Sequence, residues 1–239
     1  MGKTRYPTGA RPLLIEETAR RRRIESRFVE LLEGAGFAEV ILPIIDFAEP
    51  YAGITGRESA KQSYRFTDRE GELVSIRSDF TPMVARALAP ALRDANLPLR
   101  VFYRGDVIRC SAFRLGANRE MFQIGAEIIG DASADADVAM LRLGATIASA
   151  FFDKPLVVYT LPPSALCPLP SALQDPRFLL HEHNDPAEDP GYYTGLRFWI
   201  YGDDRRKPIA LGGRYDSLYE RFGASAPAIG LTFTVDDLD

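Results

Sequence analysis

Strand-like runs joined by turns recur along this chain and limit the folds that are open to it. LRVFYRGDVIR (residues 99–109) and MFQIGAEIIG (residues 121–130) are rich in β-branched and aromatic residues, and the polar segment SAFRLGANRE joins them. Asp68-Arg69-Glu70-Gly71 lies between two shorter runs of this kind and predicts a hairpin turn. Strands linked mainly by hairpins favour an antiparallel sheet with helices packed on one side. The sequence therefore predicts an α+β fold.

Helices are predicted where apolar residues recur with helical spacing. Residues 16–34 form the first such stretch, and one of its stripes holds Ile24, Phe28, Leu31 and Leu32. A second helix should start at Thr81 and Pro82, because a proline in the first turn loses no required hydrogen bond. Residues 135–152 predict a third.

Other strands are expected on both sides of a long connection. The run from Glu39 to Ile45 is β-rich but contains Pro43, which suits an edge strand or a bulge. Residues 156–161 predict a strand, and the Pro-rich, polar residues 162–190 predict an irregular connection. Later segments predict a strand pair in YYTGLRFWIYG and PIALGG, a turn into a helix in GRYDSLYERFG, and a closing segment in AIGLTFTVDDLD.

Composition excludes several classes of protein. No apolar run approaches the ~18 residues of a membrane span, and the N-terminus lacks the apolar core of a signal peptide. Two cysteines cannot form a disulfide framework or a four-cysteine zinc site. His181 and His183 have no third histidine or cysteine nearby and suit an exposed loop better than a metal site. We therefore expect a cytoplasmic protein without a metal or cofactor.

The charge balance argues against nucleic acid as a partner. The net charge is −4, so no overall basic field attracts phosphates. The basic run from Arg20 to Arg23 could contact RNA, but a solvated helix face or an oligomer contact fits it better.

Residues 121–130 carry the most informative polar pattern. Gln123, Gly125 and Glu127 share one face of the predicted strand, and the other face is apolar, with Phe122, Ile124, Ala126 and Ile128. A small molecule could lie over Gly125 and offer an ammonium group to Glu127. The alternative is a face that is simply wet, although solvent alone would not require a glycine in a strand. The pattern leaves both interpretations open.

Three other places could bear chemistry. Asp79 and Thr81 lie at a strand-to-helix junction, where Thr81 could act only as a helix cap. Tyr192 and Tyr193 are adjacent, so on a strand they would face opposite sides. The paired glycines of LGGRYD (residues 211–216) suit a close backbone approach or an ordinary tight turn.

Taken in order, these stretches resemble a class II aminoacyl-tRNA synthetase of the histidyl branch. FTDREGELVSIRSDFTP, FYRGDVIR with FQIGAEIIG, GYYTGLRF, LGGRYDSLYERFG and APAIGLTF follow one another as in that family. The resemblance runs from about residue 9 to the end. It implies one domain over residues 1–239, with about six antiparallel strands flanked by helices. It also implies a dimer formed through the N-terminal helix and the Pro43 strand.

The resemblance also implies an amino-acid site. Asp79 and Thr81 match the segment that holds the amino group of histidine. Arg109 matches the arginine that contacts the amino-acid carboxylate and the α-phosphate of ATP. The remaining matches are to the pair that cradles histidine and the tyrosines around the imidazole, at Gln123, Glu127, Tyr192 and Tyr193.

Three departures concern the ATP contacts. Ser111 stands where the family has a glutamate that reads the adenine amino group, and Glu188-Asp189-Pro190-Gly191 replaces a segment with a charge-stabilising arginine. Asp237 stands where an arginine grips the γ-phosphate. Replacing the attraction between an arginine and the γ-phosphate by repulsion between a carboxylate and that phosphate, at ~4 Å, makes the interaction energy less favourable by several kcal/mol at an effective dielectric of ~20. Missing cationic donors should slow adenylate formation by orders of magnitude.

An amino-acid site without these ATP contacts resembles the histidyl-synthetase-like regulatory subunits of ATP phosphoribosyltransferase, as does the segment DFTPMVAR. Those proteins lack the anticodon-binding domain. The resemblance implies a chain with no catalytic residue that senses histidine, and a homodimer that joins the short-form catalytic subunit in a hetero-oligomer. The alternative is a reduced ligase that activates an amino acid for a tRNA or another acceptor.

Overall fold

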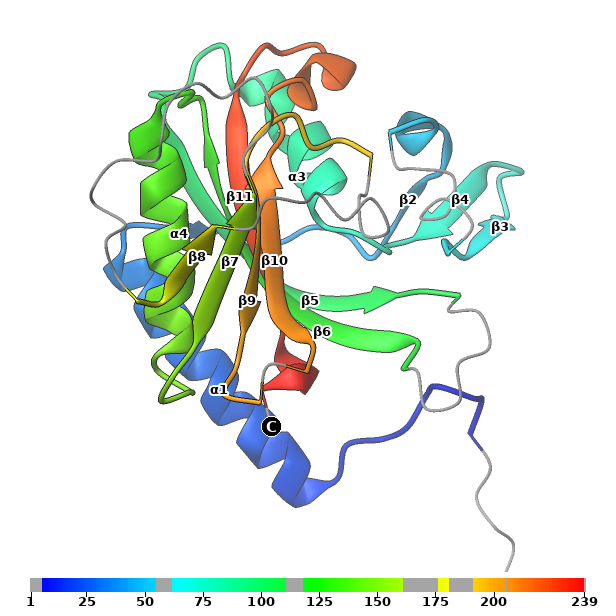
Figure 1. Cartoon of the computed structure of the whole chain (residues 1–239). Helices are drawn as coiled ribbons and strands as arrows, with labels where there is room; N and C mark the ends of the chain where they lie inside the picture. The colour runs from blue at the N-terminus through cyan, green and yellow to red at the C-terminus, as the bar shows by residue number, and fades with distance from the viewer. Residues whose placement is uncertain are drawn as a thin grey trace, which may run out of the picture.

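A computed structural model describes residues 6–54, 62–110, 118–160, 176–180, 191–204 and 206–238. Its centre is an eight-stranded sheet in the order β1-β5-β6-β11-β10-β9-β7-β8 (Figure 1). In that order the strands are Ala38–Glu39, Leu99–Ile108, Glu120–Ile129, Ala228–Thr234, Pro208–Arg214, Arg197–Tyr201, Leu156–Thr160 and Phe178–Leu180.

The sheet is mixed rather than wholly antiparallel. Its six middle strands, from β5 to β7, pair antiparallel, which confirms the expected number and direction of strands there. The outermost strands β1 and β8 each add a parallel pair, to β5 and β7. Of the connection expected over residues 162–190, the structure describes only residues 176–180, which include β8.

Two apolar cores lie on opposite faces of this sheet. Helices α1 (Ile15–Gly34) and α4 (Ala134–Ala148) cover one face, where Phe28 of α1 packs in the same cluster as Ile124 and Ile128 of β6. Helix α3 (Thr81–Leu88) covers part of the other face, where Phe80 and Tyr103 stack with ring centroids 4.3 Å apart. Helix α4 ends four residues before the predicted end at residue 152.

A smaller sheet lies beside the large one, on the side away from α4 (Figure 1). It pairs β2 (Ile45–Phe47), β4 (Leu73–Ile76) and β3 (Arg65–Thr67) antiparallel in that order. The predicted hairpin is confirmed: the Asp68 carboxylate accepts hydrogen bonds from the Glu70 and Glu72 amides at 3.0 and 2.9 Å.

The single strand expected from Glu39 to Ile45 is wrong. Strand β1 ends at Glu39 and β2 begins at Ile45, so Pro43 lies in neither. Proline has no N–H to give to a ladder, and here the carbonyls of Leu42 and Pro43 accept from the Arg77 guanidinium at 3.1 and 3.3 Å.

Four 3-10 turns complete the described elements: η1 (Glu49–Tyr51), η2 (Ala89–Ala91), η5 (Tyr219–Phe222) and η6 (Val235–Asp237). The helix expected within GRYDSLYERFG is only η5, which stops at Gly223 with a φ of 84°. Glycine adopts this left-handed conformation without the penalty that other residues incur.

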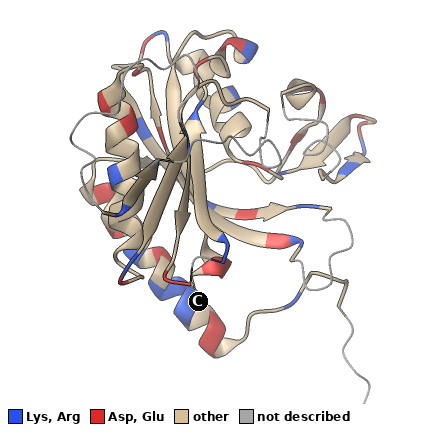
Figure 2. Cartoon of the chain, in the orientation of Figure 1, with Lys and Arg blue, Asp and Glu red and all other residues tan. Residues whose placement is uncertain are grey.

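Acidic and basic residues are interspersed along the chain in Figure 2, including those on α1. Within the basic run of α1, Arg21 forms an ion pair with Asp236, and Arg22 pairs with Glu25 at 2.5 Å. These two arginines serve contacts within the chain. No helix in the described part of the chain is long and apolar enough to cross a membrane.

Candidate functional site

Glu127 lies at the centre of a buried group of hydroxyls. Its side chain is 1% exposed, so the interpretation of this strand face as wet is wrong. Oε1 accepts from the Thr81 hydroxyl at 3.1 Å and the Tyr103 hydroxyl at 3.2 Å, and Oε2 accepts from the Tyr215 hydroxyl. The predicted alternation of β6 is confirmed, because Ile124, Ala126 and Ile128 pack in the core on the opposite face.

Glycines make room for this group. Gly230 pairs with Glu127 across β11 and β6, and a methyl group on Gly230 would overlap the carboxylate. Gly125 pairs with Tyr103 across β6 and β5, and a methyl group there would overlap the phenol. The predicted open gap over Gly125 is therefore wrong, since the Tyr103 ring fills it.

Burial controls the ionisation of Glu127. Desolvation, reinforced by the negative charge of Asp79, raises the pKa of Glu127 to about 8, although the hydroxyls of Thr81 and Tyr103 oppose the shift. Burial also raises the pKa of Tyr103 well above its usual value. At neutral pH the carboxyl is thus mostly protonated, and a cationic ligand would favour its ionised form.

Thr81 does not cap helix α3, whose N-cap residue is Phe80; Asp79 lies one residue earlier. Its Oδ1 accepts the Thr81 N–H at 3.1 Å, while the Thr81 hydroxyl is directed to Glu127. The second oxygen, Oδ2, accepts from the Tyr192 hydroxyl at 3.0 Å. Hydrogen bonds therefore link four of the predicted site residues in one chain: Asp79, Thr81, Glu127 and Tyr192.

The two adjacent tyrosines do not lie on a strand. They precede β9, so they need not face opposite sides, and their ring centroids are 5.2 Å apart. Tyr192 also meets Tyr215 edge to face at 5.8 Å, and the Arg197 guanidinium lies over the Tyr193 ring at 5.5 Å. A β-carbon at Gly213 would come within 2.7 Å of the Tyr193 ring, which explains one of the paired glycines as a close approach.

The structure places Gln123 on β6 and Arg109 against the Ser78 carbonyl. Gln123 is 7% exposed and shares the strand face of Glu127, four residues away along β6. Arg109 lies just beyond β5, and its Nε donates to the Ser78 carbonyl at 2.9 Å, which ties it to the residue before Asp79.

Tyr103, Tyr215 and Thr232 were not among the predicted site residues. The Tyr103 hydroxyl joins Thr232 Oγ1 at 2.9 Å as well as Glu127. Tyr215 lies in the LGGRYD stretch, whose glycines were the available signal. The sequence carried no signal for Tyr103, because the register of β5 against β6 is what brings its ring to the site.

Of the departures from the family pattern, Asp237 is described. It lies in η6, where its carboxylate pairs with Lys207, and the neighbouring Asp236 accepts the Phe122 N–H at 2.9 Å. Ser111 and residues 188–190 lie outside the described residues, as do His181 and His183. Among the side chains that the structure describes, no group of three His, Cys, Asp or Glu residues could hold a metal ion.

The fold is that of a class II aminoacyl-tRNA synthetase core. A crystal structure described as an ATP phosphoribosyltransferase regulatory subunit/histidyl-tRNA synthetase from Bacillus halodurans matches it with a TM-score of 0.83 at 20% identity, covering 98% of this chain and 82% of that one. Residues 9–159 and 170–238 match the histidyl-tRNA synthetase family. The chain belongs to this family, which confirms the resemblance seen in the sequence.

Curated relatives carry two different names. ATP phosphoribosyltransferase regulatory subunits from Geobacter metallireducens and Geobacter sulfurreducens are 36% identical over 142 residues and 28% identical over 310 residues. These matches cover 59% and 96% of this chain. A histidine–tRNA ligase from Methanocaldococcus jannaschii is 28% identical over 316 residues, covering 98% of this chain and 76% of that protein.

The match spans only part of each relative. It covers 33% of the Geobacter metallireducens protein and 71% of the Geobacter sulfurreducens protein.

Proposed function

We propose that this protein is a non-catalytic regulatory subunit of ATP phosphoribosyltransferase that senses histidine. Two relatives that match 59% and 96% of the chain carry that name. The observation that carries the proposal is the buried Glu127 carboxyl, to which Thr81, Tyr103 and Tyr215 donate.

This group suits a small ligand that carries nitrogen donors. Glu127 has no cationic partner among the described residues, so an ammonium or imidazolium group would supply the missing charge. The Tyr192 ring meets the ring of Tyr215, which donates to Glu127, and the Tyr193 ring lies 5.2 Å from that of Tyr192, so these rings would provide aromatic contacts. Asp79 and Arg109 would then serve the amino and carboxylate groups of histidine.

The charge at the end of β11 argues against ATP chemistry. Asp237 and its neighbour Asp236 present two carboxylates in η6, paired with Lys207 and Arg21. Lys207 is paired with Asp237, so this ion pair offers no net positive charge to a triphosphate. Since phosphoryl and adenylyl transfer depend on fixed cationic donors, we expect no adenylate formation.

Calorimetry with histidine tests the site. We expect a Kd of about 1 mM or tighter for the wild type and no detectable binding for Glu127→Ala. Glu120→Gln is the matched control, because Glu120 starts the same strand but is exposed. Unaltered binding by Glu127→Ala would reject the proposed site.

A ligase that activates an amino acid is the second candidate, because relatives named histidine–tRNA ligase match the chain equally well along its length. Pyrophosphate exchange with ATP and each amino acid distinguishes the two. We expect none above background, and robust exchange would establish the ligase. Salt-dependent binding of tRNA would instead support an RNA-binding role for Arg20 to Arg23.

The proposed partners are a second copy of the chain and the short-form catalytic subunit, in the cytoplasm. Between β1 and β2, and along β2 itself, the chain exposes apolar side chains that a partner could cover. Ile41 is 91% exposed, and Ile44, Ile45 and Phe47 are 45–47% exposed. Purification of the tagged protein from its own cells should recover the phosphoribosyltransferase catalytic chain. Sedimentation should show a dimer that Ile41→Asp dissociates.

A further inference from the structure

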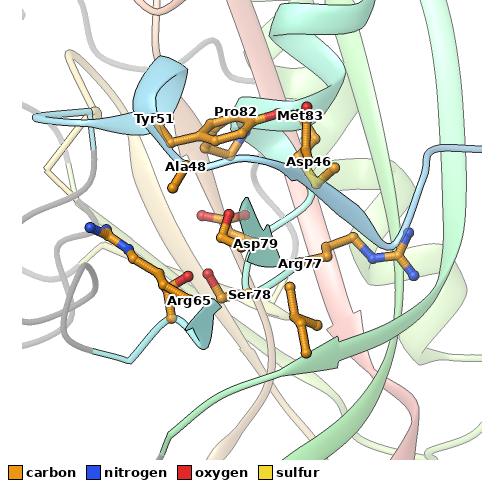
Figure 3. A pocket seen from close by; sticks show the side chains of 12 residues that line it. Asp46, Ala48, Tyr51, Arg65, Arg77, Ser78, Asp79, Pro82 and Met83 are labelled. Atoms are coloured by element: carbon orange, nitrogen blue, oxygen red, sulfur yellow. Dashed lines mark hydrogen bonds between the residues drawn. The ribbon is translucent and has the colours of Figure 1, made fainter. Parts of the chain in front are cut away.

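A cavity of about 240 Å³ lies between helices α1 and α4 and the large sheet, on the face of the sheet opposite to Glu127. Its volume exceeds the roughly 150 Å³ of an engineered apolar cavity that binds benzene. The pocket beside Asp79 in Figure 3 measures only about 40 Å³ and borders the group already described. The larger cavity therefore has room for a ligand of its own.

The end of helix α1 and the sheet beneath it supply two sides of this cavity. Leu31 lies in the last turn of α1, and Ala35 is the residue after that helix. Phe37, just before β1, and Ile128 of β6 form the floor, and both are almost completely buried. The interior is therefore apolar on these sides.

Helix α4 forms the opposite wall and part of the mouth. Ala139, Leu143 and Ile147 recur every four residues, which puts them on one side of the helix. Ala139 has the smallest side chain of the three, so a larger residue at this position would take up part of the cavity. Arg142 and Thr146 also line the cavity but are exposed, so they lie at its mouth.

The Arg100 guanidinium brings a positive charge next to the apolar interior. It lies over the Phe37 ring at 5.8 Å from the centroid, and its Nη1 donates to the Ala35 carbonyl at 3.4 Å. Within the described part of the chain, no carboxylate forms an ion pair with Arg100. None of the described residues that line the cavity is acidic. Together with Arg142, Arg100 makes the mouth cationic.

We propose that this cavity binds a small amphipathic carboxylate, with its apolar body between α1 and α4 and its carboxylate against Arg100 and Arg142. Burial of the apolar body is favourable, and the carboxylate gains charge-assisted hydrogen bonds from the guanidinium groups. An uncharged hydrocarbon would forgo the arginines, and a simple anion would leave the interior empty. Aromatic and branched aliphatic acids are the chemical class that fits.

This inference goes beyond the proposed function and does not depend on it. Ile128, in the floor of the cavity, follows Glu127 directly along β6, and successive side chains of a strand lie on opposite faces of the sheet. The sheet therefore separates the two ligands.

Amide chemical-shift titration of the full chain tests the proposal, with phenylacetate, phenylethanol and acetate as probes. We expect phenylacetate to perturb Ala35, Phe37 and Thr146, and to bind about tenfold more tightly than acetate, which has no ring to bury. Phenylethanol has the ring without the charge and should bind about fivefold less tightly than phenylacetate.

Two variants test the two parts of the site. Ala139→Leu should weaken phenylacetate binding about tenfold by filling the cavity, and Ala134→Leu is its control, because Ala134 starts the same helix but is exposed and does not line the cavity. Arg100→Met should weaken binding about fivefold, and Arg93→Met, at an exposed position away from the cavity, should not. Because Arg100 is exposed, Arg100→Met tests the site even if a larger residue at position 139 disturbs α4.

Glu127→Gln separates this cavity from the proposed histidine site. Phenylacetate binding should persist in this variant within about twofold, even where histidine binding is lost. Loss of phenylacetate binding in Glu127→Gln would place the ligand at the histidine site and overturn the proposal. It is equally overturned if acetate binds as tightly as phenylacetate, or if both Ala139→Leu and Arg100→Met leave phenylacetate binding intact. Dissociation of a dimer by Ala139→Leu in sedimentation would mean that a second copy of the chain covers the cavity instead.

Discussion

Gly230 lies directly beneath Glu127, paired with it across the β6–β11 ladder, and the carboxylate occupies the space that any larger residue at position 230 would need. The position of the Glu127 carboxylate thus depends on the absence of a side chain at position 230 of the neighbouring strand.

Gly230→Ala should displace the carboxylate and break its bonds to the hydroxyls. Losing satisfied partners of a buried polar group costs about 1–3 kcal/mol, so urea unfolding should show a loss of that size together with a loss of histidine binding. Gly34→Ala is the control, because a methyl group at that helical position meets nothing within 4 Å and should stabilise slightly. Full histidine affinity in Gly230→Ala would contradict this account.

The raised pKa of Glu127 predicts a pH-dependent stability. The folded protein holds this proton up to a pH of about 8, whereas the unfolded chain releases it near 4.5. Stability should therefore fall by several kcal/mol as the pH rises from about 5 to 8, since folding then opposes ionisation. Glu127→Gln carries no such proton, so its unfolding free energy should decline less over that range. Parallel curves for the two proteins would show an ordinary pKa.

Arg214 should be among the most costly side chains to remove. It is 6% exposed and joins β10 to the start of α4, donating to Asp137 at 2.8 Å and to the Asp131 carbonyl at 3.0 Å. Arg214→Met would leave Asp137 unpaired, at a cost of about 3–5 kcal/mol in chemical denaturation. Arg206→Met, at an exposed pair 3.7 Å from Asp204, should change stability by less than about 1 kcal/mol.

Tyr192→Phe isolates the link between Asp79 and the aromatic side of the site. Only the 3.0 Å hydrogen bond to Asp79 is lost, so we expect a loss of about 0.5–1.5 kcal/mol and weaker histidine binding. Tyr159→Phe on β7, outside the site, should leave histidine affinity unchanged. Equal effects of the two variants on binding would mean that Tyr192 plays no part in it.

Local patterns predicted the parts of the site that lie along one strand. The alternation of β6 placed Glu127 and Gln123 on one face and Ile124 on the other, because side-chain direction in a strand follows from sequence alone. The Asp68 turn was predictable for the same reason, since its hydrogen bonds join residues within four positions.

Features that depend on the register and extent of strand pairing were not predictable. Tyr103 fills the space above Gly125 only because β5 and β6 pair in one register, and a shift of one residue would point it to the other core. The parallel edge strands β1 and β8 are short and carry little sequence signal, which explains why a wholly antiparallel sheet was expected. Whether Tyr192 and Tyr193 lay on a strand depended likewise on where β9 begins.

The two faces of strand β6 have different roles. On one face, Ile124, Ala126 and Ile128 pack against helices α1 and α4 in the core, and on the other face lie Gln123 and Glu127. Substitutions on the second face can change what the molecule recognises without loosening the scaffold. Such a division would allow the same fold to evolve between proteins that catalyse a reaction and proteins that only bind a ligand, with few compensating changes elsewhere.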